Sequence, residues 1–234
     1  MPEEKKVTSQ LNLTGALTLI ALDFCVVHFH IGVVPYEPVN RLLCAAAFVL
    51  VALIAREAQA TDFGLQVEKV ESDLWWTVKF AIILAVAAVV CFGLSVVAVR
   101  VWRIEFLYRL FLAVEKVPGV TAYLHDLLRK AVLAAAVEEI IYRGIAYPPM
   151  RKAFGKTFGI LINALLFTAL YWWVYGGGFR WQPLIGGMVF AYAFEKTNSI
   201  LPPILLHFLT TAAVLTWGLA NFEWPDQIAA LIGR

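Results

Sequence analysis

The chain has 234 residues and a net charge of only +2, and 61% of its residues are hydrophobic. Soluble domains are nearer about 45–50% apolar. Together with a mean hydropathy of +0.76, this composition excludes a protein that covers itself with a polar surface in water. The small net charge gives no basis for a nucleic-acid partner. The sequence therefore predicts a single membrane domain over residues 1–234.

Long apolar segments predict the membrane-spanning helices. The hydrocarbon core of a bilayer is about 30 Å thick, and a helix needs roughly 20 apolar residues to cross it. In chain order, the candidate spans cover residues 12–34, 40–55, 74–99, 131–149, 157–175, 183–196 and 199–221. An eighth helix could lie within 104–128. We therefore predict an all-α fold, a polytopic membrane helix bundle of about seven to eight helices.

Two of the connecting segments have a distinct composition. Residues 56–73 are polar and predict an exposed connector. Residues 100–130 mix basic with large apolar side chains, a pattern typical of an amphipathic helix on the membrane surface. Basic residues stand on both sides of the predicted spans, so the positive-inside rule does not give the membrane orientation.

The fourth predicted span carries three ionisable residues, Glu138, Glu139 and Arg143. Each costs about 2.5–3.5 kcal/mol near a bilayer centre, so such residues usually face the bundle interior and mark a functional site. On a regular helix Glu139 and Arg143 share one face and can form an ion pair, whereas Glu138 points about 100° away. We predict that Glu138 remains free for chemistry. The alternative is an ion-pair network that only holds helices together.

Histidines occur in two other predicted spans. His207 lies near the centre of the last span, and Thr211 follows one turn later on the same face. A polar pair here and an acid pair on another helix predict a shared site. In the first span His28 and His30 point about 200° apart on a regular helix, so both cannot face one pocket.

The Glu138-Glu139-xxx-Arg143 pattern resembles the EExxxR motif of the CAAX-processing and bacteriocin-processing (CPBP) intramembrane proteases, the family that includes the Rce1-like prenyl-protein endopeptidases. Residues 186–207, GGMVFAYAFEKTNSILPPILLH, are similar to the third motif region of this family. The resemblance covers roughly residues 60–212. It implies a helical bundle with its active site open within the membrane, a mechanism without metal or cofactor, and a membrane-associated protein or peptide substrate.

The resemblance also implies roles for individual residues. Glu138 would activate the attacking water, Glu139 and Arg143 would support and orient it, and His207 would help to bind the oxyanion.

Two positions depart from the family pattern. Tyr171 stands where the second motif has histidine, and Thr211 stands where the third motif has asparagine. A phenol is a poor base at neutral pH, although it donates a hydrogen bond. Water activation would then rest on Glu138 alone, or His28 or His30 would complete the site, or the protein would be an inactive member of the family.

The leading hypothesis is therefore an intramembrane endopeptidase, from its length a compact one of a prokaryotic cell membrane. The alternative is a catalytically degenerate member that acts as a binding, scaffold or immunity protein. A proton-coupled transporter would also use buried carboxylates, but no inverted repeat supports one. A zinc site built from Glu138, His207 and a histidine of the first span has suitable ligand types, but the HExxH pattern is missing.

Overall fold

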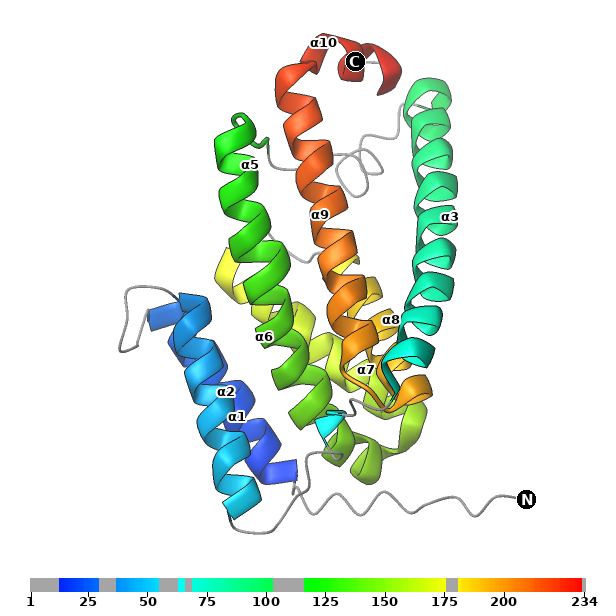
Figure 1. The fold of residues 1–234 in the computed structure, drawn as a ribbon. Helices are drawn as coiled ribbons and strands as arrows, with labels where there is room; N and C mark the ends of the chain where they lie inside the picture. The colour runs from blue at the N-terminus through cyan, green and yellow to red at the C-terminus, as the bar shows by residue number, and fades with distance from the viewer. Residues whose placement is uncertain are drawn as a thin grey trace, which may run out of the picture.

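The computed structural model describes residues 13–29, 37–54, 63–65, 69–102, 116–175 and 181–232, and these form helices and no strand (Figure 1). In chain order the elements are α1 (Leu13–Phe29), α2 (Glu37–Ile54), α3 (Val70–Trp102), α5 (Val120–Asp126), η4 (Leu127–Ala134), α6 (Ala135–Glu139), η5 (Ile140–Ala146), α7 (Tyr147–Tyr175), α8 (Trp181–Thr197), α9 (Leu201–Glu223) and α10 (Pro225–Ile232). The predicted all-α membrane bundle is confirmed.

Three stretches of the described helices are long and apolar enough to cross a membrane. They are Val70–Leu94, Val120–Trp173, which includes a reversal of the chain, and Leu201–Glu223. Large apolar side chains of α3 point outward, and Val89 is 71% exposed. A helix with such a surface suits lipid rather than water.

The helix that carries the acid pair is longer than the predicted span 131–149. It starts at Val120 and runs without a break through α5, η4, α6 and η5 into α7. Residues 120–130 are its first turns, so the surface helix predicted over 100–130 is wrong for them. Residues 103–115, which include most of the eighth candidate helix, lie outside the described residues.

Two π-helical segments, η4 and η5, flank the five α-helical residues Ala135–Glu139. In a π-helix the backbone hydrogen bonds join residues five apart, and such turns are frequent at functional sites. The acid pair therefore stands at the end of a short α-helical insert between two wider turns. The backbone on either side of the acid pair therefore departs from regular α-helix geometry, although the Glu139–Arg143 contact that this geometry predicts is formed.

The chain reverses inside α7 at Gly155, whose φ of 75° is unfavourable for residues with a side chain. The second half of α7 then packs back against η5, and the Asn163 side-chain amide donates to the Tyr142 carbonyl at 2.7 Å. A Cβ at Gly159 would lie 3.0 Å from the Arg151 Cα. Glycine at these positions permits a tight antiparallel hairpin. This hairpin orients Tyr171 toward the acid pair.

The short described segment 63–65 ties the start of α9 to the bundle. Phe63 is 3% exposed, and the Ile200 amide donates to the Gly64 carbonyl at 3.0 Å. Gly64 has φ 75°, and a Cβ there would meet the Phe194 ring at 2.6 Å. The prediction of an exposed connector over 56–73 is therefore wrong at Phe63 and Gly64.

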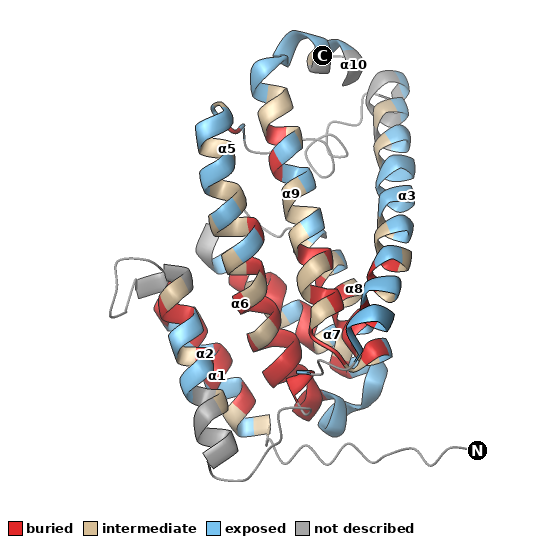
Figure 2. Cartoon of the chain, in the orientation of Figure 1, coloured by how far each residue is buried: buried red, intermediate tan, exposed pale blue. Residues whose placement is uncertain are grey.

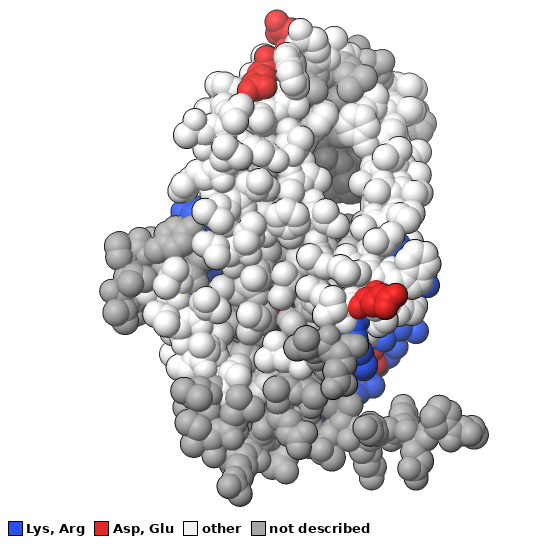
Figure 3. All heavy atoms as spheres, in the orientation of Figure 1, with Lys and Arg blue, Asp and Glu red and all other residues white. Residues whose placement is uncertain are grey.

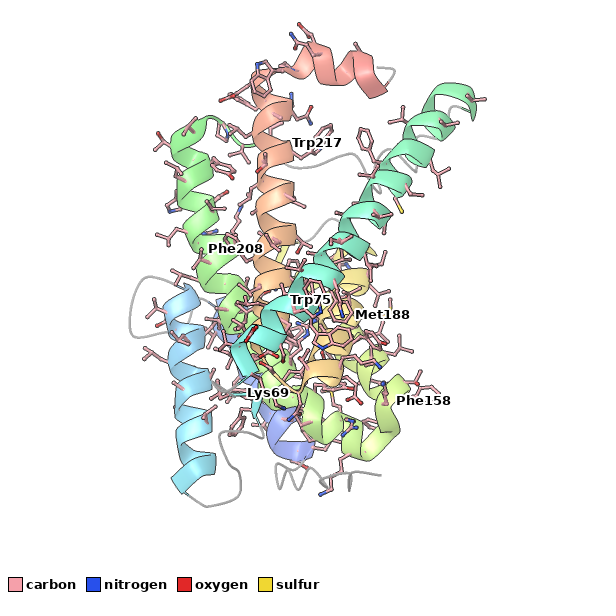
Figure 4. The ribbon with its side chains drawn as sticks, turned by 45° about the vertical axis from the view of Figure 1, so that its right-hand side comes forward. Lys69, Trp75, Phe158, Met188, Phe208 and Trp217 are labelled. Carbon is pink, nitrogen blue, oxygen red and sulfur yellow. The ribbon has the colours of Figure 1, made fainter. Side chains whose placement is uncertain are left out.

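Buried residues concentrate around α6, η5 and the parts of α7, α8 and α9 that meet them, whereas α3 and α5 are mostly exposed (Figure 2). The largest hydrophobic cluster joins α1 and α2 to η5 and α7; its fully buried members include Leu19, Ala45, Ile141, Ile145 and Phe167. Along α9, Trp217 contacts Phe92 of α3 with ring centroids 5.6 Å apart (Figure 4). The two N-terminal helices therefore share a core with the helix of the acid pair.

Candidate active site

Glu139 forms the ion pair that its spacing from Arg143 predicts. Its Oε1 accepts a hydrogen bond from Arg143 Nη1 at 2.9 Å and lies 2.8 Å from His207 Nδ1. Glu139 and Arg143 are both fully buried, and His207 is 5% exposed. One carboxylate oxygen therefore connects the guanidinium on its own helix to the imidazole of α9.

Aromatic rings and one close helix contact hold the Arg143 guanidinium. Its Cζ lies 4.4 Å from the centre of the Phe167 ring, a distance typical of cation–π contact. Its Nη2 donates to the Gly187 carbonyl at 3.1 Å. A Cβ at Gly187 would lie 3.3 Å from that same nitrogen and 3.2 Å from the Ala164 Cβ. The glycine thus lets α8 approach α7 and offers its backbone to the buried cation.

The sequence predicts a free Glu138 side chain, but in the structure both of its carboxylate oxygens have partners. Its Oε1 lies 2.9 Å from Arg41 Nη1, and its Oε2 accepts a hydrogen bond from the Tyr171 hydroxyl at 3.0 Å. The same Oε2 is 3.8 Å from His207 Nε2. Helix spacing could not anticipate this, because Arg41 stands 97 residues earlier in the chain.

Asp23 and Arg41 are the members of the cluster that sequence reasoning missed. Arg41 binds both oxygens of Asp23, with Nε 2.7 Å from Oδ1 and Nη2 2.9 Å from Oδ2. The side chains are 1% and 3% exposed. The available signal was Asp23 itself, a lone carboxylate inside an apolar helix, which is the same signal that singles out Glu138.

His207 presents its two nitrogens to two different carboxylates. Its ring stacks on Phe190, with centroids 5.1 Å apart and an interplanar angle of 22°, and meets the Phe167 ring edge-on at 5.8 Å. With this packing Nδ1 faces Glu139 and Nε2 faces Glu138. The structure therefore brings five of the six predicted site residues into one cluster: Glu138, Glu139, Arg143, Tyr171 and His207.

Thr211 is the predicted site residue without a recorded contact to this cluster. It is half-buried one turn after His207, and its hydroxyl has no hydrogen bond to any residue that the structure describes. The neighbouring Thr210 instead donates to the carbonyls of Leu206 and His207, both at 3.0 Å. The side chain of His28 and the whole of His30 lie outside the described residues.

The cluster contains three carboxylates, from Asp23, Glu138 and Glu139, but only the two guanidiniums of Arg41 and Arg143. Buried charges are costly unless they are balanced by partners. A single proton, on His207 or on a carboxylate, makes these six groups neutral together. Within the described ranges, no group of three His, Cys, Asp or Glu side chains is arranged to hold a metal ion.

An apolar groove of about 340 Å³ opens beside the cluster, between α2, the acid-pair helix and the start of α9. Its lining is hydrophobic throughout: Leu42, Ala45, Ala46, Val49, Phe63, Leu65, Ile140 and Ile200. Leu42 follows Arg41 in the chain, and Ile140 follows Glu139. Apolar chains of a substrate or a lipid are the chemistry that such a lining accepts.

Comparison with known proteins finds one family to which part of the chain is similar. Residues 120–213 match the Rce1-like family model, described as type II CAAX prenyl endopeptidase Rce1-like. The match includes all six predicted site residues but neither Asp23 nor Arg41, and it begins later than residue 60, where the motif resemblance starts. No curated protein and no solved structure matches the chain.

The matched family consists of membrane proteases that act on peptide substrates. Three helical stretches of spanning length and the outward-facing apolar side chains of α3 agree with that setting, so the chain is an integral membrane protein. The resemblance drawn from the EExxxR pattern is confirmed where the acid pair and His207 lie. Over residues 120–213, this chain is similar to the Rce1-like family.

Proposed function

We propose that the chain is a multi-pass intramembrane endopeptidase in which Glu138 activates water to hydrolyse a peptide bond of a membrane-associated protein or peptide, without a metal or cofactor. The observation that carries the proposal is the meeting of three groups at one buried oxygen. Glu138 Oε2 accepts from the Tyr171 hydroxyl at 3.0 Å and faces His207 Nε2 at 3.8 Å. A base, a hydroxyl donor and an imidazole are thereby available within one small volume.

The spacing of these groups suits a water molecule. A carboxylate oxygen has two lone-pair directions, so Oε2 can accept a proton from water in addition to the Tyr171 bond. The 3.8 Å between Oε2 and His207 Nε2 is too long for a direct hydrogen bond. A water beside the line that joins them could contact both at about 2.8 Å.

In the proposed reaction Glu138 removes a proton from water as the water oxygen attacks the carbonyl carbon of the substrate. The carbonyl electron pair moves onto its oxygen, where the N–H of His207 is the nearby donor; the O–H of Tyr171 can donate there only after it turns away from Glu138 Oε2. When the C–N bond breaks, the proton held by Glu138 passes to the leaving nitrogen. One water is consumed, and one carboxyl and one amine are produced. Glu139 and Arg143 position His207.

A second candidate, a binding protein that does not cleave its partner, is favoured by the bonds that already hold Glu138. Arg41 binds its Oε1 and the Tyr171 hydroxyl donates to its Oε2, so a water molecule has to share these oxygens with partners that are already present. The variant Tyr171→His introduces the residue that the resemblance implies at this position. Cleavage that appears only in this variant would identify the natural chain as a degenerate, peptide-binding member.

The proposed function is tested with purified protein in liposomes that contain either a peptide with a prenylated C-terminus or an unmodified membrane-spanning peptide. Glu138→Gln keeps the shape of the side chain but removes the base, so we expect cleavage to fall by about 10²–10⁴-fold. Glu195→Gln is the matched control, because Glu195 pairs with Tyr147 and Arg151 rather than with the cluster. Unchanged turnover in Glu138→Gln contradicts the mechanism.

A further inference from the structure

Two lysine side chains from different helices lie over one tyrosine ring at the end of the bundle where α7 reverses. Lys156 Nζ of α7 lies 5.6 Å from the centre of the Tyr192 ring, and Lys196 Nζ of α8 lies 5.7 Å from the same point. Both distances are within the range of cation–π contact. All three residues are exposed on the surface of the protein. Two positive charges therefore stand beside one ring on the outer face of α7 and α8.

The acidic residue beside this pair, Glu195, is engaged mainly by another cation. Its Oε2 lies 2.7 Å from Arg151 Nε and accepts a hydrogen bond from the Tyr147 hydroxyl at 2.9 Å. Its Oε1 is 3.8 Å from Lys156 Nζ, which is longer than a hydrogen bond. Lys196 has no ion pair with a carboxylate in the described part of the chain. Three cations therefore share one carboxylate, and this surface keeps an excess of positive charge.

Aromatic residues of α3 extend the same surface. Phe80 meets the Tyr192 ring edge-on, with centroids 5.9 Å apart, and stacks on Trp76 at 5.7 Å. Lys79 Nζ lies 5.0 Å and 4.6 Å from the ring centres of Trp75 and Trp76, so its side chain reaches back one turn toward the start of α3. Tryptophan and tyrosine are enriched at membrane–water interfaces, and lysine side chains near helix ends extend toward the interface. This surface therefore lies at the level of the lipid headgroups.

Exposed apolar side chains continue from this surface toward the middle of the hydrocarbon layer. On α8, Ile185 lies seven residues before Tyr192, which places both on the same face of the helix. On α7, Phe158, Leu161 and Leu165 form a second exposed row, and Phe158 projects outward from the helix (Figure 4). A free phosphate ion would use only the positive charges, whereas a phospholipid would also cover this apolar face.

We propose that Lys156, Tyr192 and Lys196 form a headgroup site that binds the phosphate of an anionic phospholipid, while the acyl chains of this lipid lie along the exposed faces of α7 and α8. A phosphodiester carries one negative charge and several acceptor oxygens, so it can bind both ammonium groups at once. Basic side chains between membrane helices are a recurrent binding place for such headgroups. The site lies outside the acid-pair cluster, and the proposal does not depend on the proposed function.

Native mass spectrometry tests the site with purified protein in micelles that contain equal amounts of phosphatidylglycerol and phosphatidylcholine. We expect the unaltered protein to retain phosphatidylglycerol in preference by about 5–25-fold, since each basic side chain near a membrane surface contributes roughly fivefold. The double variant Lys156→Gln/Lys196→Gln should lose this preference. Lys116→Gln/Arg129→Gln removes the same charge elsewhere in the bundle and should keep it. Equal retention of the two lipids by the unaltered protein, or equal preferences in the two double variants, overturns the proposal.

Thermal unfolding in neutral detergent separates a lipid site from a site for free phosphate. Phosphatidylglycerol is expected to raise the Tm of the unaltered protein by more than phosphatidylcholine does. Inorganic phosphate at the same concentration should leave the Tm unchanged, because the ion cannot cover the apolar face, and equal stabilisation by this ion contradicts a lipid site.

The substituted side chains are exposed, so the Lys156→Gln/Lys196→Gln variant should unfold at a similar temperature to the unaltered protein when no lipid is added. If this double variant does not fold, Lys156→Gln and Lys196→Gln are measured singly. Each is expected to lower the preference for phosphatidylglycerol by about fivefold, and an undiminished preference in both overturns the proposal.

Discussion

At the scale of single residues, removing Glu138 and removing Glu139 leave different buried cations affected. Arg143 has one carboxylate within ion-pair distance among the described residues, that of Glu139, and otherwise a carbonyl and aromatic rings. Arg41 has two carboxylates, from Asp23 and Glu138. Removing Glu139 therefore leaves a buried cation without a charged partner, whereas removing Glu138 leaves Arg41 paired with Asp23.

We expect Glu139→Gln to lower the free energy of unfolding by about 3–5 kcal/mol, the usual cost of breaking a buried ion pair from one side. Glu138→Gln is expected to cost less, because Arg41 keeps its bidentate contact with Asp23. Denaturant unfolding in detergent micelles, followed by tryptophan fluorescence, measures both variants against the unaltered protein. A larger loss in Glu138→Gln would contradict this order.

At the scale of elements, the contact between α7 and α8 places Arg143. Gly187 faces Ala164 so closely that a Cβ would lie 3.2 Å from both its Cα and its Cβ. Gly186, one residue earlier, faces only the Phe190 ring, at 3.4 Å and beyond. The two neighbouring glycines therefore differ in the space around them, and only Gly187 lies against the buried Arg143 guanidinium.

Gly187→Ala is expected to separate α7 from α8 slightly and to destabilise the protein by about 1–3 kcal/mol, as overpacking does in other cores. It should also lower turnover, because the Gly187 carbonyl binds Arg143. Gly186→Ala is the matched variant and should leave both properties unchanged. Thermal unfolding and peptide cleavage, measured side by side, check the pair, and equal effects at the two positions would refute the packing argument.

The helices and their contacts differ in how well the sequence predicts them. The spans over 74–99, 131–149, 157–175 and 199–221 were predictable because apolar segments of about 20 residues have few other uses, and the Glu139–Arg143 pair followed from helix spacing. The Arg41–Glu138 contact did not, because it depends on how α2 packs against α6. The π-helical turns of η4 and η5 were equally hidden, since no residue pattern in 127–146 distinguishes them from an ordinary helix.

At the scale of the whole molecule, the residues that the structure describes at the two ends differ in charge. Exposed basic side chains gather where α3 begins, α7 reverses and α8 ends: Lys69, Arg151, Lys152, Lys156 and Lys196. Figure 3 shows most blue atoms gathered toward this end, next to one red patch, and red atoms also at the opposite end, where Glu223 and Asp226 are exposed. The positive-inside rule therefore favours a cytoplasmic position for the basic end, an orientation that the sequence alone did not give.

This orientation is testable with cysteine labelling in a variant that lacks Cys25, Cys44 and Cys91. We expect Lys156→Cys to react with a membrane-impermeant maleimide only in inside-out vesicles, because its position lies at the basic end. Glu223→Cys should react only in right-side-out vesicles. The reverse pattern would show that the basic end faces outward.

The distance between Arg151 and Glu138 limits which peptide substrates the proposed protease could cleave. Thirteen residues separate them along one helix, which corresponds to about 20 Å at 1.5 Å per residue. With Arg151 at one edge of a hydrocarbon layer about 30 Å thick, the Glu138 carboxylate lies deep inside that layer. A peptide that enters there as an intact helix has every carbonyl bonded to its own backbone. Under the proposed function, such a substrate has to arrive frayed, as a chain end or a stretch that forms helix poorly.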